Sequence, residues 1–246
     1  MESVDGRPGG WDGHLVLVHH NEAQRRIGVA AWVDRGLDLG AKVLYTEPPS
    51  EPAERSFMSL LVEQNVDVGE AKERGQLEVF SADAKAYDPA WQASVVAAAL
   101  AEGYPSVRWS GEADTAWGVM SPAAHADVEW ATDELCHVEP VSILCQYSTR
   151  LSLETLQTVC AMHGDGVRES LLHTSPVPGG IALAGEVDAS NEKVLRSALL
   201  AATSAAEQGS LVLEMGSLHF LDVRGARSLL TGTSAYRCGG GTVYLR

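Results

Sequence analysis

Histidine and cysteine side chains around two apolar runs are the groups in this chain that could carry metal, redox or nucleophilic chemistry. His14 begins the first run, which ends at His19 and His20, and Cys145 ends a later run, with His163 beyond it. Imidazole and thiolate are metal ligands, and a thiol beside an imidazole is also used for nucleophilic attack. Side chains alternate across a strand, so His14 and His20 lie on one side of the first run and His19 on the other. Because a cysteine at the end of an apolar strand is more often simply buried, we expect neither a metal site nor a catalytic residue here.

Phosphate binding is disfavoured by the segment after the first run. Residues 19–26 contain no glycine, the first being Gly28, and no Gly-Lys-Ser/Thr motif follows. The close backbone approach that cradles phosphates therefore cannot form, and Glu22 places a carboxylate where phosphates would sit. The chain also lacks the Gly-x-Gly-x-x-Gly and Gly-x-Ser-x-Gly motifs. We expect a protein that is not an enzyme.

A second candidate site combines aromatic and charged residues. Arg108, Trp109 and Glu112 follow one another across a short glycine-containing stretch, and Trp117 comes soon after. One interpretation is a pocket with apolar walls in which an Arg–Glu ion pair orients a small ligand. The other is an ion pair that only ties down a loop and adds little stability if exposed. The sequence leaves both open.

Short apolar runs alternate with helical patterns through the first two thirds of the chain. This alternation predicts an α/β fold with a mainly parallel sheet between two layers of helices. The predicted strands are residues 14–19, 41–45, 76–80, 107–109 and 141–145, and the predicted helices are 22–39, 56–64, 88–103, 123–137 and 152–163. Ligands of such sheets lie beyond the carboxyl ends of the strands. The polar residues expected to gather there are His19, His20, Glu22, Glu47, Arg108, Glu112, Gln146 and Tyr147.

A second, smaller α/β unit is expected at residues 181–246, after a linker rich in proline and glycine at residues 169–180. Its predicted strands are 181–184, 210–214 and 242–245, with a turn at 185–188 and helices at 189–207 and 223–236. Charge supports the division. From Pro176 onward six basic and six acidic residues balance, so the whole net charge of −15 lies before that point.

Composition narrows the class of protein. The excess of 33 acidic over 18 basic residues disfavours binding to nucleic acid or to anionic membrane surfaces. No window is apolar enough to span a bilayer, and the polar start of the chain lacks the features of a secretory signal. We therefore expect a cytoplasmic protein. Its four cysteines, Cys136, Cys145, Cys160 and Cys238, have no Cys-x-x-Cys spacing and should remain thiols.

Residues 11–168 resemble the methanogen/methylotroph sensory domain, called MEDS. The resemblance rests on His14, on "GLDLGAKVLY" (36–45), "RGQLEVF" (74–80), "EGYPSVRWSGEADTAW" (102–117) and "ILCQYS" (143–148), and on the later His163. It implies a fold similar to RecA- and KaiC-type ATPase domains without a working phosphate loop, and a role in sensing small molecules, which are hydrocarbon derivatives in some members. Where the family often has a tyrosine after the first strand, this chain has His19 and His20. The family's positions and the strand ends together give the expected ligand-binding set: His14, His19, Glu22, Arg108, Glu112, Trp117, Cys145, Tyr147 and His163.

Residues 181–246 resemble a STAS domain, the fold of anti-sigma factor antagonists, in a version that is short at its C-terminus. The resemblance rests on "LAGEVDASNEKVLRSAL" (183–199) and "LVLEMGSLHFLDVRGARSLL" (211–230). Asp222 can cap the following helix, and Gly225 permits close approach of a partner or of neighbouring backbone. The family's regulatory serine corresponds to Arg224, so the resemblance implies that the usual phosphorylation switch is absent. The expected partner-binding residues are Asp188, Asp222, Val223, Arg224, Gly225 and Arg227.

These observations predict a bacterial signalling regulator that acts on transcription. A small ligand would bind the first unit, and the STAS surface would then gain or lose an anti-sigma factor of the kinase-like class. We assign no cofactor and leave a homodimer open. The alternatives are a degenerate nucleotide-binding enzyme, a metal or redox sensor using histidine and cysteine, and a second unit that serves only dimerisation.

Overall fold

The computed structural model describes residues 11–49, 51–118, 120–206 and 209–246. Two compact units divide the chain. The first contains the residues up to His14 together with Asn21–Tyr147, and the second contains Leu15–His20 together with Ser148–Arg246. Most of the polar N-terminal stretch discussed above, residues 1–10, lies outside the described residues.

The first unit is built on four parallel strands in the order β5(Val141–Ser148), β4(Val107–Glu112), β2(Lys42–Glu47) and β3(Leu77–Ser81). Leu44 of β2 lies opposite Trp109 of β4, which lies opposite Ile143 of β5. Because all four strands run in the same direction, their carboxyl ends meet along one edge of the sheet.

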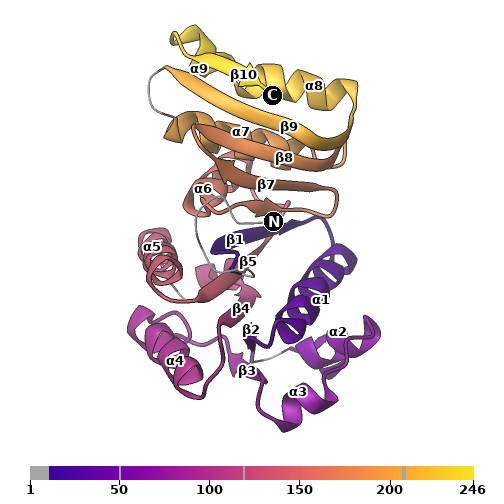
Figure 1. The fold of residues 1–246 in the computed structure, drawn as a ribbon, viewed down its shortest axis with the longest axis vertical. Helices are drawn as coiled ribbons and strands as arrows, with labels where there is room; N and C mark the ends of the chain where they lie inside the picture. The colour runs from indigo at the N-terminus through magenta and orange to yellow at the C-terminus, as the bar shows by residue number, and fades with distance from the viewer. Residues whose placement is uncertain (1–10, 50, 119, 207–208) are drawn as a thin grey trace. The chain divides into compact units, whose positions relative to one another are not determined.

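Helices cover both faces of this sheet, with α1, α2 and α3 on one side and α4 and α5 on the other (Figure 1). Burial on both faces explains the apolar runs within β2 and β5, whereas β3 at the edge of the sheet is mostly exposed. The helices begin where the sequence provides caps: Asn21, Asp88 and Ser121 each accept a hydrogen bond from a backbone N–H in the first turn. The elements are α1(Glu22–Asp38), η1(Ala53–Arg55), α2(Phe57–Glu63), α3(Gly69–Glu73), α4(Pro89–Ala101), η2(Ala113–Gly118) and α5(Pro122–Val138).

The second unit has a mixed sheet in the order β10-β9-β8-β7-β6-β1. β7 is antiparallel to both of its neighbours, and the other pairs are parallel. The strands are β1(His14–His19), β6(Val167–Arg168), β7(Leu172–Val177), β8(Gly180–Val187), β9(Ser210–Leu221) and β10(Thr242–Leu245).

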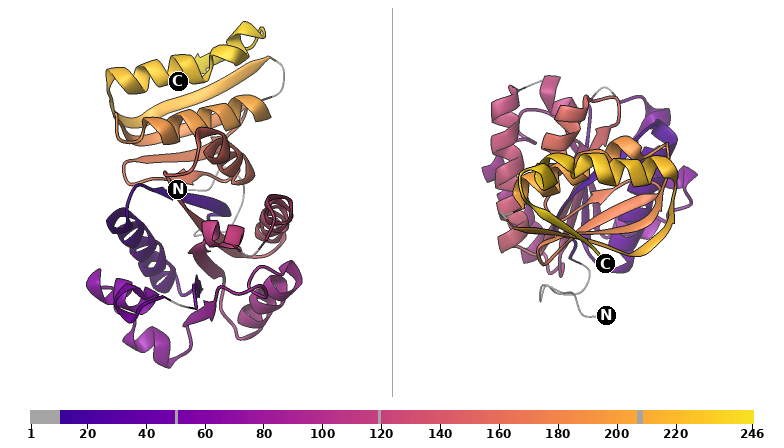
Figure 2. Two further views of the ribbon diagram at one scale, coloured as in Figure 1. Left: turned by 180° about the vertical axis from the view of Figure 1, so that it is seen from behind. Right: turned by 90° about the horizontal axis from the view of Figure 1, so that it is seen from above.

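The helices of the second unit lie on one face of its strands. In Figure 1 the strands β7, β8 and β9 stand in front of the helices, and in the rear view of Figure 2 the helices stand in front. The apolar side of α7 packs onto the sheet through Leu195 and Leu199, which join Leu172, Leu183 and Leu213 in one buried cluster. The helices are α6(Leu153–Met162), α7(Glu192–Ala205), α8(Val223–Gly232) and α9(Ser234–Cys238).

The predicted fold class is confirmed, as are most helix starts, but several boundaries were wrong. The strand predicted at residues 107–109 is longer than expected, because β4 continues to Glu112. The predicted turn at 185–188 belongs mostly to β8, which runs through Gly185 at φ +95° with an irregular register to β9. A glycine that signals a turn in sequence can also mark a strand irregularity.

The segment predicted as a linker is also structured. Residues 172–177 form β7, in which Leu172 and Thr174 are buried on alternate positions, although Pro176 and the glycines that follow suggested a loop. All four cysteines are free thiols, as expected. Among the helices of the described residues, none combines the length and apolar character needed to cross a bilayer.

Candidate functional site

Arg25 joins the ends of three strands of the first unit. Its Nη1 donates to the Tyr45 hydroxyl at 3.0 Å and to Gln146 Oε1 at 3.1 Å, and lies 2.9 Å from the Glu112 carboxylate. Its other nitrogens bind both carboxylate oxygens of Glu22 at 2.7 and 2.6 Å. Burial lowers the pKa of Arg25, but the hydrogen bonds with Glu22 and the neighbouring charges outweigh burial and raise it. The guanidinium is thus permanently charged and neutralised by two carboxylates, so it does not attract a further anion.

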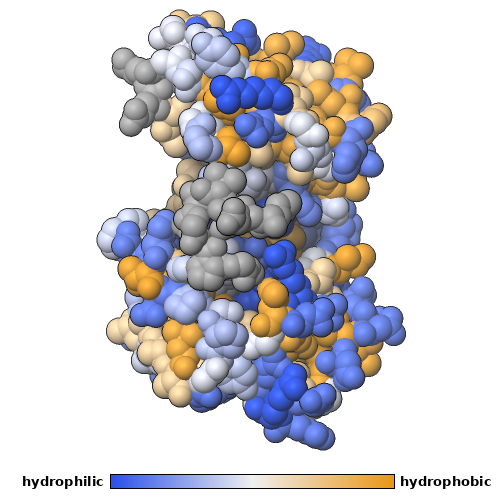
Figure 3. All heavy atoms as spheres, viewed as in Figure 1, coloured by the Kyte–Doolittle hydropathy of each residue, from blue (hydrophilic) through white to orange (hydrophobic). Residues whose placement is uncertain are grey.

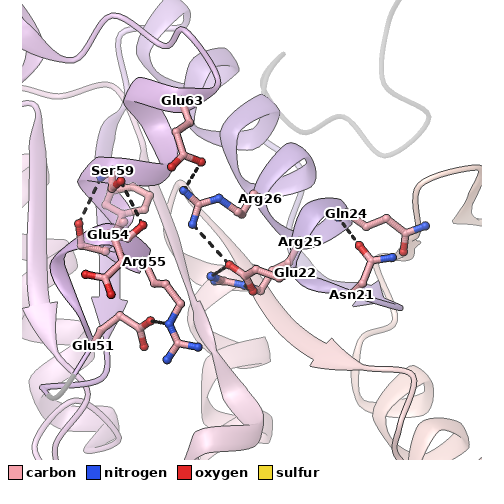
Figure 4. A network of polar contacts seen from close by, with 12 residues as sticks. Asn21, Glu22, Gln24, Arg25, Arg26, Glu51, Glu54, Arg55, Ser59 and Glu63 are labelled. Carbon is pink, nitrogen blue, oxygen red and sulfur yellow. Dashed lines mark hydrogen bonds and ion pairs between the residues drawn. The ribbon is translucent and has the colours of Figure 1, made fainter.

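The first turn of α1 is fixed by a second arginine, as Figure 4 shows. Arg26 lies 3.6 Å from Glu22 and 2.6 Å from Glu63 of α2. Asn21 caps the helix by accepting a hydrogen bond from the Gln24 N–H at 3.0 Å. A carboxylate held by two arginines therefore stands at the helix start that a phosphate-binding loop would use.

A small cavity of about 70 Å³ opens at the same edge of the sheet. Trp109 forms part of its wall and donates from Nε1 to Thr46 Oγ1 at 2.8 Å, and Tyr87 is held by a 2.8 Å hydrogen bond to Thr115. The lining mixes aromatic and polar side chains, among them Ser110, Glu112, His125, Glu129, Thr132 and Cys145.

Glu129 and Cys145, which line one side of this cavity, form a cluster with the buried His14. His14 Nε2 lies 3.2 Å from Glu129 Oε2 and 3.5 Å from Cys145 Sγ, and Cys145 Sγ lies 3.7 Å from the same Glu129 oxygen. The other nitrogen of His14, Nδ1, lies 3.5 Å from Asp133 Oδ1. Glu129 and Asp133 reach His14 together because residues four apart share one face of α5.

The charged states in this cluster follow from its contacts. Burial lowers the pKa of His14, but hydrogen bonds with Asp133 and Glu129 outweigh burial, so the pKa is raised above its ordinary value. Burial, and then the charge of Glu129, raise the pKa of the Cys145 thiol well above its usual range. In this arrangement the cysteine is a protonated thiol rather than a free nucleophilic thiolate.

Further residues orient the second oxygen of Glu129. The Tyr147 hydroxyl donates to Oε1 at 2.7 Å, and His125 Nε2 lies 3.2 Å from the same atom. Trp117 packs beside both, with ring centroids 5.6 Å from His125 and 5.8 Å from Tyr147. The structure thus brings four expected residues, His14, Trp117, Cys145 and Tyr147, into one cluster, while Glu22 and Glu112 meet through Arg25.

Arg108, also expected in the ligand site, does not line the small cavity. It is 1% exposed, its Nη2 lies 2.9 Å from Asp12 Oδ2, and its guanidinium stacks 3.5 Å from the ring centroid of Trp32. Glu112 pairs with Arg25 instead, so the expected Arg108–Glu112 pair does not form. Four residue steps along β4 place the Cα atoms of the two residues about 13 Å apart, which puts Arg108 near the opposite end of the strand.

The remaining histidines of the expected set belong to the second unit. His19 ends β1 and is half-buried. His20 lies 3.5 Å from Glu169 and 3.2 Å from the Thr149 hydroxyl. His163 follows α6 and is buried, with Nδ1 2.8 Å from the Val159 carbonyl oxygen.

The expected partner-binding residues surround the start of α8 and the end of β8. Asp222 caps α8 as expected, its Oδ1 accepting from the Gly225 N–H at 2.7 Å. Val223, Arg224 and Arg227 are exposed, and Gly225 is buried. Asp188 accepts two hydrogen bonds from Ser190, from its N–H at 2.7 Å and its hydroxyl at 2.6 Å.

Sequence reasoning missed the helical members of the site. Arg25 of α1 and His125, Glu129 and Asp133 of α5 do not follow a strand, so the rule of strand ends did not select them. The spacing of four between His125, Glu129 and Asp133 is the available signal, because it puts three metal-ligand types on one helix face.

Comparison with known proteins assigns both halves of the chain. The family model described as MEDS, MEthanogen/methylotroph, DcmR Sensory domain, matches residues 13–164, and the STAS domain model matches residues 173–246. No curated protein matches. Both resemblances expected from the sequence are therefore confirmed.

Two solved structures are similar to this chain at low sequence identity. An uncharacterized protein, PH0321 from Pyrococcus horikoshii, crystallised with an unknown peptide, is 15% identical with a TM-score of 0.47, covering 72% of this chain and 83% of that one. The flagellar accessory protein FlaH from Methanocaldococcus jannaschii is 10% identical with a TM-score of 0.42, covering 69% of this chain and 75% of that one.

Proposed function

Since the chain belongs to the MEDS family of sensory domains and continues into a STAS domain, we propose that it is a non-enzymatic regulator that couples a small ligand to a protein partner. The two matches support a signalling or regulatory role. The observation that carries the finer proposal is the cavity at the strand ends, whose walls include Glu129 and Cys145, the two residues that contact the buried His14.

The cavity favours a small, uncharged ligand. Its volume of about 70 Å³ suits a molecule of only a few non-hydrogen atoms. Trp109 and Tyr87 provide apolar surface, while Ser110 and Thr132 provide hydroxyls. The charge of Arg25 is already neutralised by Glu22 and Glu112, so an anionic ligand gains no partner there. A short hydrocarbon derivative with a polar or halogen substituent fits this lining.

The second unit offers a route from sensor to STAS domain. α6, from the segment matched by the MEDS model, packs against α7 of the STAS segment, and β6 pairs with β7. A ligand can shift this packing only if it binds two arrangements with different affinity. We propose that a ligand-dependent change in this packing alters the surface of α8, where the protein partner binds.

The proposed partner is an anti-sigma factor of the kinase-like class, and its docking surface is the start of α8. Val223 is 87% exposed and is flanked by the exposed Arg224 and Arg227. Figure 3, which looks onto the strand side of the second unit, shows hydrophobic and hydrophilic side chains interspersed there. Because Arg224 stands at the position of the regulatory serine, the ligand rather than phosphorylation controls this surface.

Tryptophan fluorescence tests the ligand site, because Trp109 lines the cavity. We expect saturable quenching by one class in a panel of short alcohols, ketones and halogenated alkanes. Ala86 also lines the cavity, and Ala86→Leu should weaken binding by about tenfold by filling it. The control Ala101→Leu changes an exposed residue of α4 and should bind normally. Equal binding by both variants would exclude this cavity.

Calorimetry with purified kinase-like anti-sigma factors tests the partner. We expect a complex that Arg224→Glu weakens by about tenfold or more, since interface arginines often carry large shares of binding energy. Arg150→Glu makes the same charge change at another exposed position of the second unit and should leave binding unchanged. Finding no complex, with or without a cavity ligand, would remove the partner from the proposal.

A further inference from the structure

We propose that His14, Glu129 and Cys145 form a binding site for one zinc-like divalent transition-metal ion. The three side chains come from the start of β1, from α5 and from β5, and their donor atoms lie within 4.8 Å of one another. The proposal stands on this geometry and does not depend on the ligand or partner proposed above.

The donor separations match those around a tetrahedral ion. With ordinary zinc bond lengths, tetrahedral geometry puts a nitrogen and an oxygen donor about 3.4 Å apart, and either of them about 3.6 Å from a sulfur donor. The observed values are 3.2 Å for His14 Nε2 to Glu129 Oε2, 3.5 Å for His14 Nε2 to Cys145 Sγ, and 3.7 Å for Cys145 Sγ to Glu129 Oε2. An ion can thus be accommodated with shifts of a few tenths of an ångström.

The outer contacts are those that metal ligands commonly have. A metal-bound histidine usually directs its second ring nitrogen to a carboxylate, and His14 Nδ1 faces Asp133 at 3.5 Å. The other carboxylate oxygen of Glu129, Oε1, is held by the Tyr147 hydroxyl at 2.7 Å and by His125 at 3.2 Å. His14 and Glu129, two of the three proposed metal ligands, are therefore each oriented by contacts with further side chains.

Burial and charge favour a cation over an empty cluster. His14 is fully buried and Glu129 is 4% exposed, with Asp133 close by. Carboxylates held away from water are costly unless a positive charge compensates them. Binding would replace the thiol proton of Cys145, and any proton on His14 Nε2, by the metal and release these protons to solvent.

The donor set selects the class of ion. One nitrogen, one sulfur and one carboxylate oxygen suit zinc, cobalt or ferrous iron, whereas magnesium and calcium require oxygen ligands. The three donors that the first unit supplies are the number used by zinc sites that leave a position for water or another ligand.

Cobalt substitution tests the site on the full-length protein. After removal of metal with a chelator, addition of Co²⁺ should give one ion per chain with a thiolate-to-cobalt charge-transfer absorption. Cys145→Ser should abolish that absorption, and Cys238→Ser, which changes an exposed thiol, should keep it. Asp133→Asn should weaken Zn²⁺ affinity by about 10- to 100-fold while leaving the charge-transfer band in place.

A measurement on the unmodified chain guards against variants that fail to fold. Stoichiometric Zn²⁺ should slow alkylation of Cys145, followed by peptide mass spectrometry, while leaving Cys238 equally reactive. The proposal is overturned if Co²⁺ gives no thiolate absorption, if Cys145→Ser retains it, or if Zn²⁺ does not protect Cys145.

Discussion

Arg108 shows how a charged side chain can be part of the core of an α/β unit. It lies under α1, where the glycine at position 36 leaves room: a Cβ there would stand 2.7 Å from Arg108 Cδ. Its charge is balanced by Asp12 and its flat face covers Trp32. An arginine inside an apolar strand therefore has a structural explanation here, although its position in the sequence suggested a ligand contact.

Removal of Asp12 should show how much the unpaired, buried charge of Arg108 lowers the free energy of unfolding. Asp12→Ala leaves Arg108 without its close carboxylate, and we expect a loss of about 3 kcal/mol in the free energy of unfolding, measured with urea. Asp38→Ala removes a carboxylate from an exposed position in the last turn of α1 and should change stability by less than about 0.5 kcal/mol. Similar values for the two variants would show that Arg108 finds compensation elsewhere.

Asp188 should titrate at unusually low pH. Hydrogen bonds from the Ser190 hydroxyl and N–H favour its charged form and lower its pKa below the ordinary value of 3.8. Stability from this contact is present above pH 3.8 and is lost as pH falls through the lower pKa of the folded state. Carboxyl-detected NMR should show the titration moving toward 3.8 in Ser190→Ala. An unchanged midpoint would mean that the serine does not set it.

At the scale of elements, caps and apolar runs were enough to predict most helices and the parallel strands. Asn21, Asp88 and Ser121 begin helices as their side chains suggest. Glycine and proline misled the prediction in the second unit, because both lie inside strands: Pro176 of β7 pairs with Ile181 across a tight hairpin, and Gly185 of β8 lies opposite Leu218 of β9.

The candidate site was predictable only on its strand side. His14, Cys145 and Tyr147 come from strands, and their types drew attention to them. Glu129 and Asp133 reach His14 only after α5 packs against the sheet, and Arg25 reaches Glu112 only after α1 does. Such contacts between elements depend on tertiary packing that a single sequence does not specify.

Gly225 tests the packing of α8. A Cβ at this position would lie 2.5 Å from Val187 Cγ1 and 2.7 Å from Leu221 Cδ1, so the close approach expected of this glycine is to side chains of its own unit. Alanine improves helix propensity by about 1 kcal/mol, but overpacking costs about 1–3 kcal/mol. We expect Gly225→Ala to lower thermal stability.

Gly69→Ala is the matched control for that substitution. Its Cβ would meet nothing closer than 3.6 Å, so this change at the start of α3 should be neutral or stabilising. If Gly225→Ala unfolds at the same temperature as Gly69→Ala, the packing of α8 against Val187 and Leu221 is looser than the structure indicates.

On the scale of the whole chain, the family boundary and the compact units do not coincide. The MEDS match extends to residue 164, yet β1 and α6 belong to the same compact unit as the STAS segment. A cavity of about 610 Å³ lies in this unit, bordered by Cys160 of α6, Thr174 of β7 and Ala198 of α7. The STAS segment is therefore packed partly by residues of the sensory family.

A fragment of residues 173–246 should consequently fold poorly by itself. It lacks β1, β6 and α6, so the edge of β7 loses its partner and the side of α7 that packs on α6 is exposed. We expect the NMR spectrum of the fragment to show poorly dispersed signals, and we expect the fragment to bind a hydrophobic dye. The full chain should show well-dispersed signals. A fragment that unfolds cooperatively would show that these sensory elements are dispensable for the STAS fold.

The hydrogen-bonded edge between β6 and β7 constrains how such proteins can be recombined. Dividing the gene between the two family matches would cut through a β-sheet rather than a flexible linker. Each product would then have a strand edge with unpaired backbone groups. A chimaera that joins this STAS domain to an unrelated sensory domain would have to include β1 and α6 as well, because both belong to the same compact unit. This architecture therefore favours genes in which the sensory domain and the STAS domain stay joined.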